Sequence, residues 1–282
     1  MHRYKNYILF ICAFLIIFIL YQMYNQTTTT MKYFPIDEST FILDAFTELQ
    51  YDSKEDIVNW TVHSSSSDQV YLRQDVSLVY QNGMFKGIQS KWKNNETFIE
   101  QNEVIPFKDD TLLQSITFHH GEVHHNNNQD QITSMQQMTD ASLYLIRENA
   151  TVHHFREPST SKEKKWQEKL TKKTTQQLQT HLDTLLDFHQ ITIDNYDAIP
   201  LHELSKYNDQ PLPNLNMDIT SKVIGQFWEG FYNNYITLLM SYKKEIPPHY
   251  MPFILVAKDQ SHLLVLYEMD GEKEKLIQHI TP

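Results

Sequence analysis

The stretch that decides how the rest of the chain is interpreted is residues 7–24, which read Tyr-Ile-Leu-Phe-Ile-Cys-Ala-Phe-Leu-Ile-Ile-Phe-Ile-Leu-Tyr-Gln-Met-Tyr. It has no charged residue, and as a helix it would be roughly 27 Å long, close to the hydrocarbon thickness of a bilayer. Arg3 and Lys5 precede the stretch and only Lys32 follows it closely, so the positive-inside rule orients the N-terminus inward. We therefore predict a single-pass cell-membrane protein with an uncleaved anchor, its N-terminus in and its C-terminal domain extracytoplasmic.

A cleaved signal peptide is the alternative interpretation of this stretch. It requires a shorter apolar region and small residues at the cleavage site. The run instead continues into Gln22-Met23-Tyr24-Asn25, without an Ala-x-Ala pattern. Cys12, the only cysteine, lies within the run, so neither a disulfide nor a thiol site is expected outside it. These features favour a protein of the bacterial cell envelope.

The charge balance limits the classes of partner. The chain has 24 Lys+Arg and 35 Asp+Glu, and residues 1–32 contain three of the basic residues and no acidic one. The remainder therefore carries 21 minus 35, or −14, which argues against nucleic acid as a partner. Only 6 glycines are present, in no phosphate-binding pattern, so we expect no nucleotide cofactor.

The pattern along the chain predicts an α+β fold class, in which an N-terminal single transmembrane helix precedes antiparallel sheets and two long helices. Short strand-like runs, with a turn at Asn82-Gly83, predict an antiparallel meander. A helix is expected from Ser161, a second over 218–243, and a short one after Asp37. Residues 191–217 are expected to be irregular, and residues 253–280 to form a three-stranded meander. The expected parts are a cytoplasmic tail, an anchor, a tether, a β-rich subdomain and an α+β subdomain, at residues 1–6, 7–24, 25–36, 37–157 and 158–282.

The most unusual local feature is a histidine-rich run, His119-His120-Gly121-Glu122-Val123-His124-His125. If Gly121-Glu122 forms a two-residue hairpin turn, His119 and His124 face each other with Cβ atoms about 5 Å apart, within reach of one metal ion. The candidate ligands for zinc or another divalent metal are His119, His120, Glu122, His124 and His125. His153-His154 would complete the site if their strand were adjacent.

Two other interpretations of the histidine run stay open. The spacing matches no zinc motif, and the neighbouring asparagines, Asn126 to Asn128, are typical of a solvated hairpin tip. Clustered imidazoles also titrate near neutrality, which would suit a pH-sensitive contact. Titration of the protein with zinc distinguishes metal binding from these alternatives.

A dense aromatic run, residues 227–235, supplies the candidate partner-binding residues. Phe227, Phe231 and Tyr235 share one i, i+4 row and are expected in the core. Trp228 and Tyr232 form the adjacent row, which either packs in the core or is exposed and binds a partner, because Trp and Tyr are favoured at interfaces.

No catalytic motif is present, so we expect a non-enzymatic interaction or regulatory protein that binds another envelope or membrane protein. One alternative is a metal-binding protein or metal-dependent hydrolase that uses the histidine run. Another is a module for cell-wall glycan, with Trp92 and Trp228 stacking on sugars. No catalytic residue and no organic cofactor are predicted.

Overall fold

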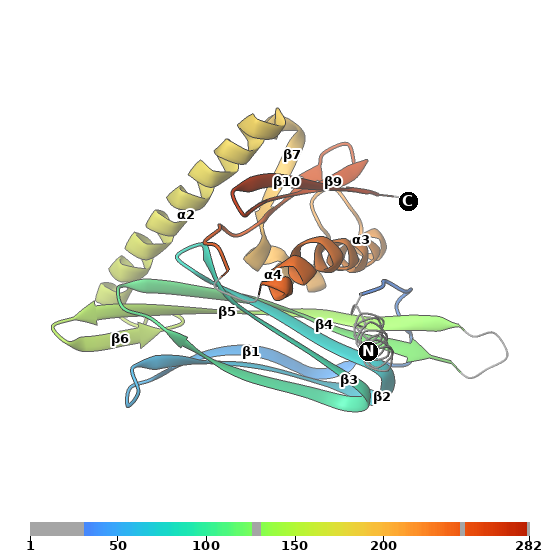
Figure 1. The fold of residues 1–282 in the computed structure, drawn as a ribbon, viewed down its shortest axis with the longest axis horizontal. Helices are drawn as coiled ribbons and strands as arrows, with labels where there is room; N and C mark the ends of the chain where they lie inside the picture. Colours follow the sequence, from blue (N-terminus) through green and yellow to red (C-terminus); the bar gives the residue numbers. More distant parts are fainter. Residues whose placement is uncertain (1–30, 126–130, 243–245, 281–282) are drawn as a thin grey trace, which may run out of the picture. The chain divides into compact units, whose positions relative to one another are not determined.

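Two antiparallel sheets dominate the computed structural model, which describes residues 31–125, 131–242 and 246–280 (Figure 1). Residues 32–282 form one compact unit. The first sheet has six strands: β1 (Ile42–Asp52), β2 (Ile57–Gln81), β3 (Met84–Pro106), β4 (Thr111–His124), β5 (Ile132–Glu148) and β6 (Thr151–Phe155). The second has four: β7 (Tyr196–Pro200), β8 (Phe253–Ala257), β9 (His262–Met269) and β10 (Glu272–His279).

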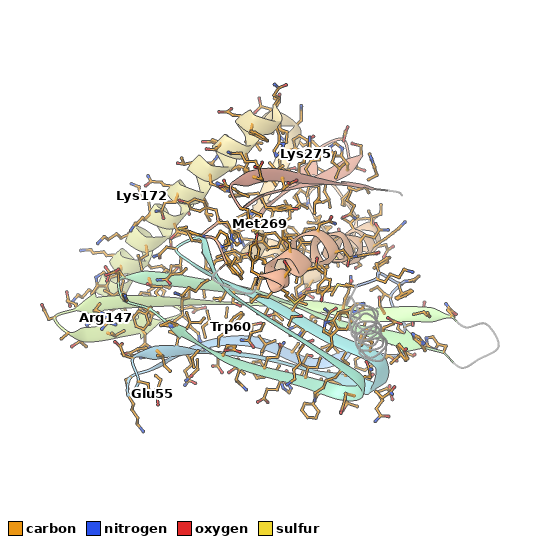
Figure 2. The ribbon with its side chains drawn as sticks, viewed as in Figure 1. Glu55, Trp60, Arg147, Lys172, Met269 and Lys275 are labelled. Atoms are coloured by element: carbon orange, nitrogen blue, oxygen red, sulfur yellow. The ribbon has the colours of Figure 1, made fainter. Side chains whose placement is uncertain are left out.

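Strand β2 organises the first sheet because its two halves have different neighbours. It pairs with β3 along both halves, with β1 along its first half and with β4 along its second. The register with β3 shifts between Ser65 and Val70, so the sheet bends there and its halves form two layers. Apolar side chains from both layers, Trp60 among them (Figure 2), make one core cluster. The turn at Asn82-Gly83, with φ of 52° and 81°, is confirmed.

The helices and the second sheet cover the other face of β4 and β5 (Figure 1). Helix α2 (Ser161–His189) is confirmed, and a Thr160–Glu163 capping box begins it. Its lysines are exposed, and Lys172 points away from the fold (Figure 2). The second predicted helix is interrupted: α3 (Met217–Phe231) passes through a π-helical turn, Tyr232–Ile236, into α4 (Thr237–Ser241). Short 3₁₀ segments occupy Ile193–Asn195 (η1) and Leu201–Asn208 (η2).

The predictions made from residues 7–24 require correction. Those residues lie outside the part of the chain that the structure describes. Among the helices described, none is both long and apolar enough to cross a membrane. The single-pass, extracytoplasmic location therefore has no support from the structure, and we withdraw it. The fold class is corrected from α+β with an anchor to a mostly antiparallel sheet with three α-helices in the described residues.

Three local predictions were also wrong. The short helix expected after Asp37 is strand β1, because its residues pair with β2 and alternate between buried and more exposed positions. The several short strands of the expected meander are parts of much longer ones, since β2 and β3 contain 25 and 23 residues. The stretch expected to be irregular, 191–217, contributes β7 to the second sheet. The three-stranded meander at the C-terminus is confirmed.

Candidate functional site

The hairpin hypothesis required a turn within the histidine run, but the structure has none there. Gly121 and Glu122 lie inside β4, where they pair with Met135 and Ser134 of β5. Gly121 gives Met135 room to pack: a Cβ atom on Gly121 would lie 2.4 Å from Cε of Met135, so that side chain would have to shift. Because β4 continues straight, successive side chains point to opposite faces of the sheet.

The predicted metal ligands are consequently separated. The imidazole of His119 is buried beside Asp75, whereas His120 is buried on the opposite face of the strand. His124 stacks on Tyr71, with ring centroids 3.8 Å apart, and contacts Glu122. His125 lies 2.6 Å from a carboxylate oxygen of Asp37. Within the described ranges, no three His, Cys, Asp or Glu side chains are grouped to hold a metal ion.

The predicted partner-binding aromatics are not at the surface. Trp228 stacks on Phe118 with centroids 4.8 Å apart, and its indole N–H points to the sulfur of Met138. Tyr232 packs edge-on against Trp92. Both Trp228 and Tyr232 are completely buried, so neither anchors a partner or stacks on a sugar in this conformation. Of the two alternatives for this row, burial favours core packing over partner binding.

A buried polar network occupies one end of the space between the two layers of the first sheet. The Ser64 hydroxyl donates to the Asp75 carboxylate at 2.6 Å and contacts the Arg73 guanidinium. Nδ1 of His119 is 3.0 Å from the same carboxylate oxygen, an ion-pair distance without hydrogen-bond alignment. Arg73, Asp75 and His119 have no exposed surface, and burial lowers the pKa of Arg73 while Asp75 opposes that shift.

Hydroxyl groups extend the network to strands β1, β4 and β5. Nε2 of His119 is hydrogen-bonded to Thr139 of β5 at 2.8 Å. Thr139 is in turn bonded to Thr47 of β1 at 2.6 Å, and Thr47 is bonded to Thr117 of β4 at 2.5 Å. A chain of polar contacts therefore fastens β1 to β5.

Close to this junction the surface is hollowed along the edge of β5. The hollow has a volume of about 310 Å³. Its walls combine apolar and amide side chains, contributed by the segment before β1, by the first residue of β1, by β5 and by the end of η2: Ile36, Phe41, Ile42, Gln136, Gln137 and Asn208. Its volume lies at the lower end of the range for ligand pockets, which is about 300–1,000 Å³.

Two kinds of group pair with the outward backbone of β5 at the hollow. Residues before β1 add a short extended segment: the Ser134 N–H donates to the Pro35 carbonyl at 2.8 Å, and the Asp37 N–H donates to the Ser134 carbonyl at 2.7 Å. Further along, Oδ1 of Asn208 accepts from the Met138 N–H at 3.0 Å, and Nδ2 donates to the Met138 carbonyl at 2.7 Å. The amide group of Asn208 thus takes the place of a neighbouring strand's peptide group.

Asp37 fixes the segment that forms one wall of the hollow. Its carboxylate accepts hydrogen bonds from the backbone and hydroxyl of Ser39, from the Thr40 N–H and from Thr133. Burial alone would raise the pKa of Asp37, but these hydrogen bonds outweigh burial and hold the pKa well below its ordinary value.

The rim of the hollow is apolar and exposed. Two of the large apolar side chains that line the hollow are exposed, Ile36 by 41% and Phe41 by 54%. Sequence reasoning missed this site because it expected a short helix after Asp37, where the structure has an extended segment and strand β1. The alternation of Thr47, Leu49 and Tyr51 with polar residues was the available signal for a strand.

Comparisons with protein-family models, with curated proteins and with solved structures each found no match.

Proposed function

We propose that this protein is a non-enzymatic interaction protein that binds an extended segment of a partner protein in the hollow along β5. The observation that carries the proposal is the exposed apolar rim beside a hollow whose floor is the edge of a strand. Exposed apolar groups gathered at one place mark interaction sites more often than isolated ones do.

The chemistry of the hollow matches an extended peptide. The chain's own Pro35–Asp37 segment pairs with Ser134, so the edge of β5 accepts an added strand at that point. The amide groups of Gln136, Gln137 and Asn208 can donate to and accept from peptide groups. Strand addition of this type obtains affinity from backbone hydrogen bonds and specificity from side-chain contacts.

Binding would exchange the hydrogen bonds that Asn208 makes to β5 for bonds from the peptide. An incoming strand would replace its two bonds to Met138 with two bonds of its own, so the number of hydrogen bonds to β5 stays the same. The net free energy would then come from burying the apolar rim, at about 25 cal/mol per Å² of apolar surface.

The test is a selection of random twelve-residue peptides on the full-length protein, followed by affinity measurement with two variants. We expect the selected peptides to be rich in β-branched and aromatic residues and to lose at least tenfold in affinity for Phe41→Ser. The matched control is Phe98→Ser, which alters a phenylalanine on β3 that is 47% exposed, against 54% for Phe41. A failure to select any peptide, or equal loss in both variants, would contradict the proposal.

A further inference from the structure

A second cavity, of about 210 Å³, lies between α2, β4, η2 and β8, apart from the hollow along β5. Leucine and phenylalanine side chains form much of its wall, among them Leu112, Leu178 and Phe253. Seven polar side chains also line it: Gln114, Thr171, Thr174, Thr175, Gln179, His202 and Glu203. The cavity thus combines apolar walls with polar groups, and small-molecule sites use the first to hold a ligand and the second to orient it.

Two of those polar side chains have a buried oxygen without a partner. Oε1 of Gln114 and Oγ1 of Thr174 have no hydrogen-bond partner within the described part of the chain. The residues are only 8% and 3% exposed. A buried polar atom left unpaired costs free energy, and such atoms are uncommon in native proteins.

Two other threonines of α2 make a local hydrogen bond that Thr174 lacks. The hydroxyls of Thr180 and Thr184 each donate to the carbonyl four residues earlier, at 2.9 Å. This local bond is the ordinary one for threonine within a helix. The Thr174 hydroxyl does not make it, although it lies on the same helix. It is therefore available to a bound molecule.

The remaining polar wall carries no positive charge at neutral pH. Burial lowers the pKa of His202 to about 4, and its Nδ1 lies 3.1 Å from the sulfur of Met251. The neighbouring Glu203 is paired with Lys206 at 2.6 Å. The cavity therefore offers no unpaired charge to a ligand.

We infer that this cavity binds a small uncharged molecule with an apolar body and one hydroxyl group. The hydroxyl would donate to Oε1 of Gln114 and accept from Oγ1 of Thr174, which would give both oxygens a partner. The size is sufficient, because an apolar cavity of about 150 Å³ accommodates benzene.

The test compares two probes of nearly the same shape, p-cresol and toluene, by calorimetric titration of the full-length protein. We expect p-cresol to bind at least tenfold more tightly than toluene, because only p-cresol carries the hydroxyl. Thr174→Val keeps the shape of the side chain, and should remove that preference while raising the stability of the free protein. Thr184→Val, an exposed position on the same helix, is the control and should leave the preference intact.

Gln114→Leu is a second variant, which keeps the test decisive if Thr174→Val folds poorly. It too should abolish the preference for p-cresol. Equal affinity for the two probes, absence of saturable binding, or an unchanged preference in the folded variants would overturn the inference.

Discussion

The hydroxyl of Thr47 on β1 lies 2.6 Å from that of Thr139 on β5, although the described parts of these strands share no ladder of backbone hydrogen bonds. The layers of the first sheet are thus joined on this side by side chains. Because Thr139 also bonds His119, the junction continues directly into the buried network of Arg73 and Asp75.

Thr47→Val should destabilise the protein by about 1–3 kcal/mol, because it leaves the hydroxyls of Thr117 and Thr139 with one fewer partner in a buried setting. Valine keeps the volume of threonine, so the loss reports the hydrogen bonds. Urea denaturation measures it. The control is Thr61→Val, whose hydroxyl bonds Asn102 at the surface and should cost less than about 0.5 kcal/mol. Equal stability of the two variants would mean that the junction contributes nothing.

Asn208→Asp should destabilise the protein, although the two side chains have nearly the same size. The aspartate keeps an acceptor for the Met138 N–H but has no donor for the Met138 carbonyl, which would face a carboxylate oxygen. We expect a loss of about 1–3 kcal/mol in urea denaturation, with greater self-association in sedimentation experiments because the edge is exposed. A variant as stable and monomeric as the parent would contradict the role given to this amide.

The sequence predicted the elements that depend on neighbouring residues. Helix α2 begins at Thr160–Glu163 because the capping box needs residues three positions apart. The Asn82-Gly83 turn needs positive φ at two adjacent residues, which these two residues adopt readily.

The functional site could not be derived in the same way. Its walls come from residues 36–42, 136–138, 207–209 and 221–224, which only the tertiary fold brings together. Glycine occurs both in turns and where a neighbouring side chain packs close to the backbone, and the sequence does not distinguish these two uses at Gly121. The neighbour that packs against Gly121 is Met135, fourteen positions away. Trp228 was ambiguous for a similar reason, since its partner Phe118 lies on another element.

Asp37→Asn should destabilise the protein by about 1–2 kcal/mol at neutral pH, because Thr133 and His125 lose a charged acceptor. The folded pKa of Asp37 lies below its unfolded value near 4. Its contribution is therefore complete above about pH 4 and is lost as the pH falls toward the folded pKa. Denaturation curves at pH 5 and pH 3 should show that the free energy of unfolding falls less in the variant than in the parent. An identical loss in both proteins would count against this carboxylate.

His120→Leu should reduce the dependence of stability on pH between 7.5 and 5. Burial, followed by the charge of Arg73, lowers the pKa of His120 from 6.5 to about 4. As the pH falls through that interval, the unfolded chain binds a proton that the folded chain does not, so folding loses roughly 2 kcal/mol. Neither ring nitrogen of His120 has a hydrogen-bond partner among the described residues, so leucine should cost little at pH 7.5.

The measurement is the free energy of unfolding in urea at both pH values, for the parent and for two variants. The control is His153→Leu, at a position on β6 whose side chain is 41% exposed. It should keep the pH dependence of the parent, whereas His120→Leu should show a decrease smaller by roughly 2 kcal/mol. Part of the dependence will remain in His120→Leu, because burial also lowers the pKa of His202 to about 4. A pH dependence equal to that of the parent would show that His120 is hydrated or paired in solution.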